Sequence, residues 1–414
     1  MYIRKKDNYW NFKTANTKEY THCYHIYPAM MIPQVARKLL TNYAPEGKLE
    51  LVFDPYLGSG TTLVEASIRG IPSIGTDLNP LARFISKVKT THFNIEKTRQ
   101  AIDSVLPEMA AYSPNKVTNT DFDRISNHTF WYSDENLYRL SYLNQIADSL
   151  TEEIKDFFLL CLSETIREVS FTRNGEYKRY KMSEKQLSAF HPDVFNIFFR
   201  KLQRNLDGLI AFNATSTDCK ASIYDFNPSI GIPQSIIQEK SVDMVVTSPP
   251  YGDSRTTVAY GQFSRWSNEW FNFENAKTLD KLLMGGTISK TEKFQTESIK
   301  EELEMIKNLS LVRYYDVISF LNDYWYSIQN VAKTVRKGGR VCYVVGNRRV
   351  KSIQINLDYF TAEMFEKCGF EHNITLVREI ASKRMPYKNS PTNQSGCKVE
   401  TMNYEYLVIL TKVQ

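Results

Sequence analysis

A short apolar strand that continues into a glycine turn and then a helix constrains this chain more than any other feature. Residues 49–55 (LELVFDP) have the apolar composition of a buried strand, and LGSGTT supplies the turn. TTLVEASIRG (61–70) is long enough for a crossover helix, and a second strand, IPSIGTD (71–77), follows it. The succession of strand, helix and strand predicts a parallel sheet covered by helices, which is an α/β fold.

Four more apolar runs extend this pattern along the chain. VDMVVTSPP (242–250) and GRVCYVVGN (339–347) have the composition of buried parallel strands. ITLVREI (374–380) and YEYLVILTK (404–412) predict an antiparallel pair at the edge of the sheet.

Helical periodicity dominates two other parts of the chain. Residues 312–335 carry apolar side chains every three or four positions, and the pair Gly338-Gly339 is expected to stop that helix. Three segments between 86 and 215 have the same spacing, namely 137–146, 154–169 and 194–210. The stretch 252–310 mixes aromatic, glycine and charged residues without a clear period.

The length of 414 residues exceeds that of one average domain. We therefore expect a large α/β domain formed by residues 1–85 and 216–414, interrupted by a helical insertion at residues 86–215. Because the last predicted strand lies at 404–412, we expect no separate C-terminal domain.

The composition is that of an ordinary globular protein. A net charge of +6 is compatible with a polyanionic partner and equally with a mildly basic enzyme. Six cysteines stand singly without metal-ligand spacing, so we expect neither a zinc site nor a disulfide framework. No run approaches the ~20 apolar residues of a membrane span, and we expect a cytoplasmic protein.

The glycine turn also predicts a cofactor site. Gly58 and Gly60 let the backbone approach a ligand closely, and the helix that begins near Thr61 offers free amide groups. Asp77 closes the second strand, where a carboxylate can accept hydrogen bonds from ribose hydroxyls, and Asp225 is expected near an adenine ring. The third glycine of a dinucleotide fingerprint and the lysine of a phosphate-binding loop are both absent, so a different nucleoside cofactor is indicated.

A second motif, Ser248-Pro249-Pro250-Tyr251, follows the strand at 242–247 directly. Two prolines fix an extended backbone and leave the carbonyl groups of Ser248 and Pro249 free to accept hydrogen bonds. The exocyclic amino group of a nucleobase is a suitable donor, and such bonds free its lone pair to attack a methyl group. Tyr251 offers a ring face on which the base can stack.

Together these motifs resemble a known family. DPYLGSGTT (54–62) and TSPPY (247–251) are similar to motifs I and IV of the amino-methyltransferases of restriction–modification systems, and THCYHIYPAMMIP (21–33) is similar to their motif X. The resemblance covers roughly residues 20–85 and 220–412 and leaves the helical insertion outside. It implies a Rossmann-like seven-stranded sheet, S-adenosylmethionine as cofactor, and a target base flipped out of double-stranded DNA.

The resemblance also assigns roles to individual residues. The catalytic loop is Ser248, Pro249, Pro250 and Tyr251. The cofactor residues are His25, Tyr27, Pro28, Asp54, Tyr56, Gly58, Gly60, Thr61, Thr62, Asp77, Asn79 and Asp225. A serine at the first position of the catalytic motif is characteristic of the cytosine-N4 branch, whereas Asp or Asn is commoner in the adenine-N6 branch.

Two basic segments compete for the DNA-facing role. Within the insertion, which is the candidate recognition region, Arg173, Lys178 and Arg179 alternate with tyrosines. After the catalytic loop, Arg255 and Arg265 would reach the duplex beside the flipped base. The insertion precedes Asp225, a position that departs from the usual order of the family. Either of the two segments can therefore be the recognition region.

The leading hypothesis is a site-specific DNA cytosine-N4 methyltransferase, with a cognate restriction endonuclease as an expected partner. Three alternatives stay open: a DNA adenine-N6 methyltransferase, an RNA base amino-methyltransferase, and a nucleic-acid-binding protein that retains the fold without turnover. The intact SPPY and glycine motifs argue against the last of these.

Overall fold

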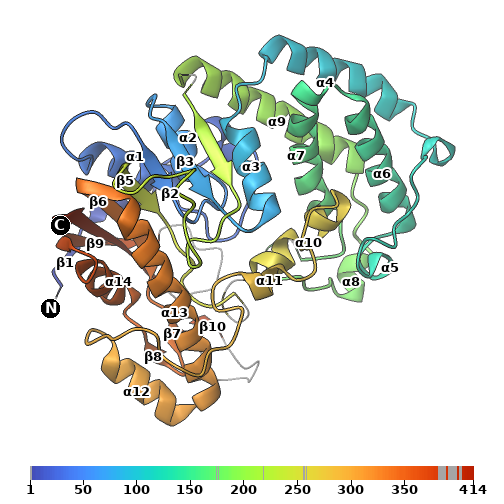
Figure 1. The fold of residues 1–414 in the computed structure, drawn as a ribbon. Helices are drawn as coiled ribbons and strands as arrows, with labels where there is room; N and C mark the ends of the chain where they lie inside the picture. Colours follow the sequence, from blue (N-terminus) through green and yellow to red (C-terminus); the bar gives the residue numbers. More distant parts are fainter. Residues whose placement is uncertain are drawn as a thin grey trace.

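A sheet of eight strands, in the order β1-β9-β12-β6-β5-β2-β3-β4, lies at the centre of the fold (Figure 1). The computed structural model describes residues 2–380 and 403–414 except 174, 176, 218, 255, 256 and 258. Between 381 and 402 it describes only the backbone of β10 (Lys388–Asn389) and β11 (Val399–Glu400). The strands of the central sheet are β1 (Arg4–Lys6), β2 (Val52–Asp54), β3 (Ser73–Thr76), β4 (Ala221–Tyr224), β5 (Val242–Thr247), β6 (Val335–Gly346), β9 (Phe370–Glu379) and β12 (Tyr404–Lys412).

The predicted Rossmann-like sheet is confirmed, with one strand more than expected. Strands β4, β3, β2, β5 and β6 are mutually parallel, and β12 runs antiparallel between β6 and β9. The eighth strand, β1, comes from the N-terminal segment and pairs in parallel with β9. The antiparallel pair was expected at the edge, but β12 is an interior strand. Its run Leu407–Leu410 is fully buried, as a strand covered on both faces must be.

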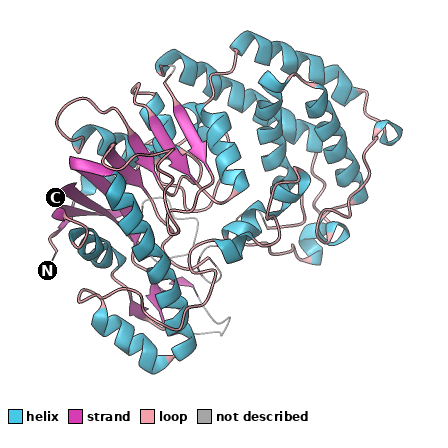
Figure 2. Cartoon of the chain, in the orientation of Figure 1, coloured by secondary structure: helices cyan, strands magenta, loops and turns pink. Residues whose placement is uncertain are grey.

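Alternate side chains of the strands enter two different cores, one on each face of the sheet. On β5, Met244 and Val246 contact the core formed with α1 (Pro33–Asn42), whereas Val245 contacts the core formed with α13 (Leu311–Thr334) and α14 (Leu357–Glu366). This is the two-residue period of a strand buried on both faces. Helices therefore cover the sheet on both sides, as Figure 2 shows.

Helix α13 confirms the helix predicted at 312–335, but the glycine pair does not end it. The helix stops at Thr334 and β6 begins at once. Gly338, which has a φ of +76°, and Gly339 lie instead within a bulge of β6, where the pairing with β5 jumps from Val335 to Arg340. Glycine suits this position because a bulge often requires a positive φ.

Between β3 and β4 the chain is helical, and the three predicted helices are present. This region contains α3 (Pro80–Thr90), α4 (Ile95–Ala110), η3 (Pro114–Lys116), α5 (His128–Trp131), α6 (Asp134–Ser149), α7 (Glu152–Glu168), α8 (Glu184–Leu187) and α9 (Val194–Thr215). Figure 1 shows α4–α9 standing beside the sheet. Helix α3 crosses residue 86, the predicted start of the insertion, and shares one apolar core with α6, α7 and α9.

The stretch 252–310 is more regular than its sequence indicated. It holds α10 (Tyr260–Trp270), α11 (Leu279–Leu282) and α12 (Lys300–Leu309). Phe263, Trp266 and Trp270 lie on one side of α10 and are buried in the core of the helical region. Their spacing is that of a helix face, a signal that the surrounding charged and polar residues obscured.

The short elements complete the fold. These are η1 (Asn8–Asn11), η2 (Tyr20–Cys23), α2 (Thr61–Ser67), β7 (Arg349–Val350) and β8 (Ile353–Gln354). Among the helices that the structure describes, none combines the length and the apolar character needed to cross a membrane.

Candidate active site

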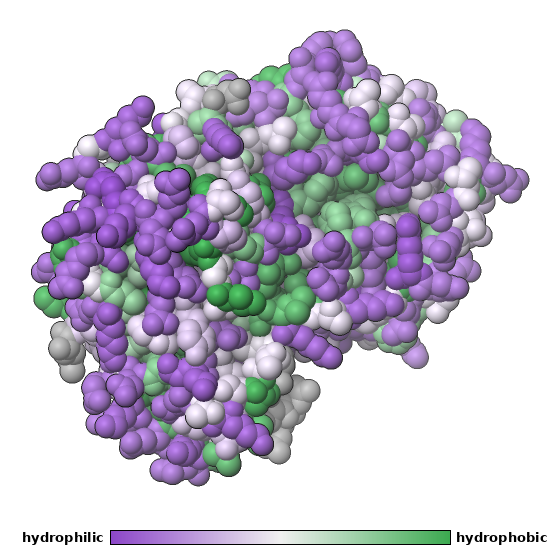
Figure 3. All heavy atoms as spheres, viewed as in Figure 1, coloured by the Kyte–Doolittle hydropathy of each residue, from purple (hydrophilic) through white to green (hydrophobic). Residues whose placement is uncertain are grey.

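A cleft of about 950 Å³, measured to its open mouth, lies where β2, β3, β4 and β5 end. In parallel sheets of this kind ligands bind at the carboxyl ends of the strands. The cleft brings together ten of the predicted residues: Tyr27, Pro28, Asp54, Tyr56, Gly58, Thr61, Asp77, Asn79, Ser248 and Pro250. Figure 3 shows apolar side chains gathered along the hollow between the sheet and the helical region.

Asp77 holds the glycine turn in place. One carboxylate oxygen accepts a hydrogen bond from the backbone N–H of Gly58 at 3.0 Å, and the other accepts from that of Asn79 at 2.8 Å. Both Gly58 (φ +50°) and Gly60 (φ +74°) have left-handed backbones. The turn after β2 and the turn after β3 are thereby joined through one side chain at the floor of the cleft.

Gly60 has no room for a side chain, which makes its replacement informative. A Cβ atom at this position would lie 2.7 Å from Ser86 Oγ on α3. We therefore expect Gly60→Ala to lower the free energy of unfolding by about 1–3 kcal/mol and to weaken cofactor binding. Gly47→Ala is the matched control, because Gly47 (φ +91°) has a left-handed backbone but no neighbour within 4 Å. Equal losses in urea denaturation of the two variants would contradict the close packing at Gly60.

A buried lysine supports the same turn from behind. Lys89 Nζ donates to the backbone carbonyl of Ser59 at 2.7 Å, and burial lowers the pKa of Lys89 to about 7. Ser59 itself lines the cleft. The turn is therefore fixed at Gly58 by a carboxylate and at Ser59 by an amine.

Asp54 connects the glycine turn to β5, the strand that precedes the motif at 248–251. Its Oδ1 accepts hydrogen bonds from the Thr247 hydroxyl at 2.5 Å and from the backbone N–H of Tyr56 at 3.1 Å. Burial raises the pKa of Asp54 to about 6. Because Thr247 immediately precedes Ser248, the bond from Thr247 sets the position of the loop at 248–251 relative to the glycine turn.

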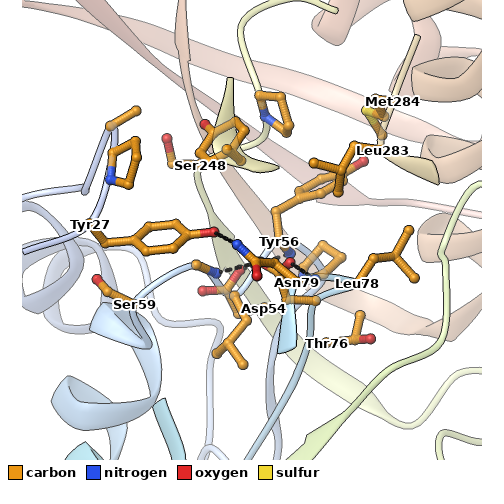
Figure 4. A pocket seen from close by; sticks show the side chains of 18 of the residues that line it. Tyr27, Asp54, Tyr56, Ser59, Thr76, Leu78, Asn79, Ser248, Leu283 and Met284 are labelled. Atoms are coloured by element: carbon orange, nitrogen blue, oxygen red, sulfur yellow. Dashed lines mark hydrogen bonds between the residues drawn. The ribbon is translucent and has the colours of Figure 1, made fainter. Parts of the chain in front are cut away.

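Asn79 joins the N-terminal segment to the cleft (Figure 4). Its Nδ2 donates to the hydroxyl of Tyr27 at 2.9 Å and to Ser264 Oγ at 2.6 Å, while its Oδ1 caps α3. The Tyr27 ring stacks on that of Tyr260 with a centroid separation of 5.9 Å. These contacts form an aromatic wall of the cleft near Asp77.

Six predicted residues do not line the cleft. Gly60 and Thr62 lie just behind it, and the Thr62 hydroxyl donates to the carbonyl of Val246 at 3.0 Å. Asp225 is exposed, and the residues that follow it, Phe226 and Asn227, line the cleft instead. The remaining three are His25, Pro249 and Tyr251.

His25 is buried behind the wall rather than exposed to a ligand. Its Nδ1 donates to the carbonyl of Ile26 at 2.5 Å, and its Nε2 lies 3.0 Å from Ser163 Oγ. Burial lowers the pKa of His25 to about 4. The ring therefore connects the N-terminal segment to α7, which agrees with a structural contribution to the pocket.

The depressed pKa of His25 predicts a loss of stability in acid. The unfolded chain binds a proton near pH 6.5 and the folded one only near pH 4, so stability falls as the pH drops from about 6.5 towards 4. Between pH 7 and pH 5 this group should account for about 2 kcal/mol. Urea denaturation of His25→Gln should show a shallower pH dependence than the wild type. The exposed His191→Gln is the control, and an unchanged slope for His25→Gln would contradict the assignment.

The loop at 248–251, predicted to be catalytic, and the residues after it have hydrogen bonds on both sides of the cleft. Ser248 Oγ lies 3.1 Å from the Tyr251 hydroxyl, which donates to Glu405 of β12 at 3.2 Å. Further along, the backbone N–H of Ser254 donates to the carbonyl of Met284 at 3.1 Å. The loop thus connects strand β12 with the wall formed by Leu283 and Met284.

The basic residues predicted to face DNA differ in their surroundings. Arg179 lies over the rings of Trp131 and Trp266, and burial, followed by the nearby Arg265, lowers its pKa. Arg265 contacts Glu269 at 3.6 Å and the carbonyl of Lys277. Arg173 is exposed and Lys178 half-buried. Arg255 lies outside the described residues.

The sequence prediction missed several residues that line the cleft. Met30 and Met31 belong to the segment 21–33 that had already been singled out, and Phe226 and Asn227 directly follow Asp225. The sequence carried no signal for Tyr260, Leu283 or Met284, because they reach the cleft only through the packing of α10 and α11.

The chemistry of the lining fits a nucleoside cofactor that carries a positive charge. Asp54 and Asp77 supply carboxylates, the aromatic and methionine side chains supply apolar surface for a ring, and the two left-handed glycines let the backbone approach closely. Within the described part of the chain, no three His, Cys, Asp or Glu side chains are grouped to hold a metal ion.

Comparisons with known proteins identify the family. The model of the N6_N4_Mtase family, described as DNA methylase, matches residues 3–87. The type II methyltransferase M.MvaI of Kocuria varians is 37% identical over 436 residues, covering 99% of this chain and 94% of that protein. M.MjaII of Methanocaldococcus jannaschii is 28% identical over 36% of this chain and 29% of its own length, and M.BsoBI of Geobacillus stearothermophilus 24% over 57% and 50%. Because the similarity to M.MvaI extends over nearly the whole of both proteins, the chain belongs to the type II DNA methyltransferases of restriction–modification systems, which take their methyl group from S-adenosylmethionine.

Proposed function

We propose that the enzyme methylates the exocyclic N4 of a cytosine that is flipped out of duplex DNA. The observation that carries the proposal is the shared cleft, in which Ser248 and Pro250 lie opposite the turn held by Asp77. A serine at the first position of the motif is the residue characteristic of the cytosine-N4 branch. Extrusion of the base is required because a base stacked within a DNA duplex cannot enter a cleft at the ends of the β-strands.

Ser248 and the prolines activate the amino group by accepting its protons in hydrogen bonds. The nitrogen lone pair of an aromatic amine is delocalised into the ring, so the amine is a weak nucleophile. Bonds from its N–H groups to Ser248 and to a proline carbonyl of the motif draw the nitrogen towards tetrahedral geometry and localise that lone pair. The ring of Tyr251 does not line the cleft, so we assign to this residue the support of Ser248 through its hydroxyl.

The remaining cleft residues bind the cofactor. Asp77 accepts hydrogen bonds from the ribose hydroxyls, and Tyr27, Tyr56 and Phe226 surround the adenine ring and the methionyl chain. Asp54 lies between this site and Ser248 and favours a positive charge nearby. When bound, S-adenosylmethionine supplies an electrophilic methyl group on a sulfonium.

The helical region and α10 together are proposed to bind the duplex. We assign residues 86–215 as an insertion in a catalytic domain made of 1–85 and 216–414. Lys178 and Arg179 of the insertion lie near Asp280 and Arg265, at the side of the cleft formed by Tyr260. Positive side chains at this position would bind phosphates beside the extruded nucleotide. A restriction endonuclease that cleaves the same sequence is the proposed partner in the cell.

A methyl-transfer assay tests the proposed function. The protein is incubated with labelled S-adenosylmethionine and plasmid DNA or tRNA, and the nucleic acid is digested to nucleosides. Label is expected in N4-methylcytosine from DNA. Label in N6-methyladenine would move the enzyme to the adenine branch, and label only in tRNA would replace the DNA substrate.

A further inference from the structure

A chain of hydrogen bonds leads from the catalytic serine away from the cleft. Ser248 Oγ lies 3.1 Å from the Tyr251 hydroxyl, and this hydroxyl donates to Glu405 Oε1 at 3.2 Å. The other oxygen of Glu405 accepts from the guanidinium of Arg378. Tyr251, Glu405 and Arg378, which do not line the cleft, are thus connected in series to the hydroxyl of Ser248, which does.

The far end of this chain is rigid. Arg378 and Glu405 are directly opposed on the neighbouring strands β9 and β12, and the Arg378 side chain is only 5% exposed. Arg378 also donates to the backbone carbonyls of Trp10 at 2.8 Å and Asn11 at 3.5 Å. Held in this way, the Glu405 carboxylate has one oxygen left for Tyr251.

The direction of each hydrogen bond follows from which groups have protons to give. A carboxylate paired with a guanidinium only accepts, so the single hydroxyl proton of Tyr251 points to Glu405. Burial raises the pKa of Tyr251 well above its ordinary value, so the tyrosine keeps that proton. The oxygen of Tyr251 can therefore only accept from Ser248, and Ser248 has then donated its one proton.

We propose that Glu405, acting through Tyr251, fixes Ser248 as a hydrogen-bond acceptor towards the target amino group. A free serine hydroxyl can donate a hydrogen bond as well as accept one. Only the accepting orientation suits an amino group whose N–H must donate to the serine. With its proton committed to Tyr251, the serine oxygen presents only lone pairs to the cleft. The chain thus gives a neutral serine the polarity of a carboxylate at the same position, and it disfavours bases that present a carbonyl oxygen there. Glu405 is a positioning residue in this inference, which rests on the proposed function.

The inference is tested with two variants that keep shape and remove one bond each. Tyr251→Phe retains the ring but loses the hydroxyl, and Glu405→Gln retains an acceptor for Arg378 but can donate to Tyr251. Each should lower the single-turnover rate of methyl transfer roughly 10- to 100-fold and change the affinity for S-adenosylmethionine less than about threefold. Because both act through one chain, the double variant should be no more than about threefold slower than the slower single variant.

Controls separate this effect from general damage to the strand pair. Tyr404→Phe removes a tyrosine hydroxyl from β12, next to Glu405, and Glu371→Gln neutralises a glutamate of the neighbouring strand β9. Both variants should transfer methyl groups at the wild-type rate. Should Glu405→Gln fail to fold, Glu405→Asp keeps the charge beside Arg378 and withdraws the acceptor from Tyr251, and the same cycle is measured with it.

Two results would overturn the inference: a wild-type rate for Tyr251→Phe, or losses that multiply in the double variant. Failure of the proposed function is a separate outcome. If the wild type labels adenine, the cytosine assignment is lost, but the same variants still report on the chain because adenine N6 is also an amine. If the wild type labels no DNA, the proposed function itself is wrong.

Discussion

Replacing Ser248 by alanine should lower the single-turnover rate of methyl transfer by about 100- to 1,000-fold, a loss of the size seen when one preorganised hydrogen-bonding group is removed from an active site. The amino group would then lose the partner that localises its lone pair. Binding of S-adenosylmethionine should change little, because the bonds that hold the glycine turn run from Gly58 to Asp77 and from Tyr56 to Asp54. Rapid-quench measurement of the rate and calorimetric titration of the cofactor give the two quantities.

Ser241, which immediately precedes β5, provides the control for this experiment. The Ser241 hydroxyl donates to the backbone carbonyl of Gln238 at 2.7 Å, far along the strand from the cleft. Ser241→Ala should therefore leave both quantities unchanged. Turnover by Ser248→Ala within threefold of the wild type would remove Ser248 from the catalytic machinery.

The second large effect is expected at Asp77, where replacement by asparagine should weaken S-adenosylmethionine binding by about 100-fold. The Asp77 carboxylate accepts from the backbone N–H groups of Gly58 and Asn79 on its two oxygens. An amide replaces one of these oxygens with a donor, so one backbone N–H loses its partner and the turn is no longer held. The negative charge that we propose faces the cofactor is lost as well.

Asp225→Asn makes the same chemical change at the other predicted cofactor carboxylate. Asp225 is exposed and the cleft is lined by Phe226 and Asn227, so we expect a change in affinity below about threefold. A large loss for Asp225→Asn combined with a small one for Asp77→Asn in the same titration would reverse the two assignments.

Local sequence was sufficient to predict the part of the site that consecutive residues form. The turn with Gly58, the carboxylate of Asp77 and the loop after β5 each follow a strand whose apolar run is unmistakable, and the carboxyl ends of parallel strands meet at one edge. Asp225 was predicted to face the cofactor, but the cleft is lined by the two residues that follow it. The reason is that β4 is a four-residue edge strand with every residue partly exposed. Such a strand has weak alternation, and which of its neighbours turns inward depends on register.

The contacts that cross long distances in the chain could not be predicted from one sequence. Glu405 meets Tyr251 across 154 positions, and nothing in YEYLVILTK distinguishes this glutamate from a solvated one. The bulge at Gly338-Gly339 likewise depends on how β6 pairs with β5. Periodicity predicts which face of a strand is apolar, but pairing decides which polar groups meet.

The aromatic face of α10 determines how the proposed recognition role of the helical region can be tested by exchanging sequence with a relative. Phe263, Trp266 and Trp270 are buried among the helices between β3 and β4, although α10 follows the catalytic loop in the chain. A chimera that exchanged residues 86–215 alone would leave these three side chains against a foreign surface. An exchange that preserves this core is therefore discontinuous: it takes the helices after β3 together with α10 from the same donor protein.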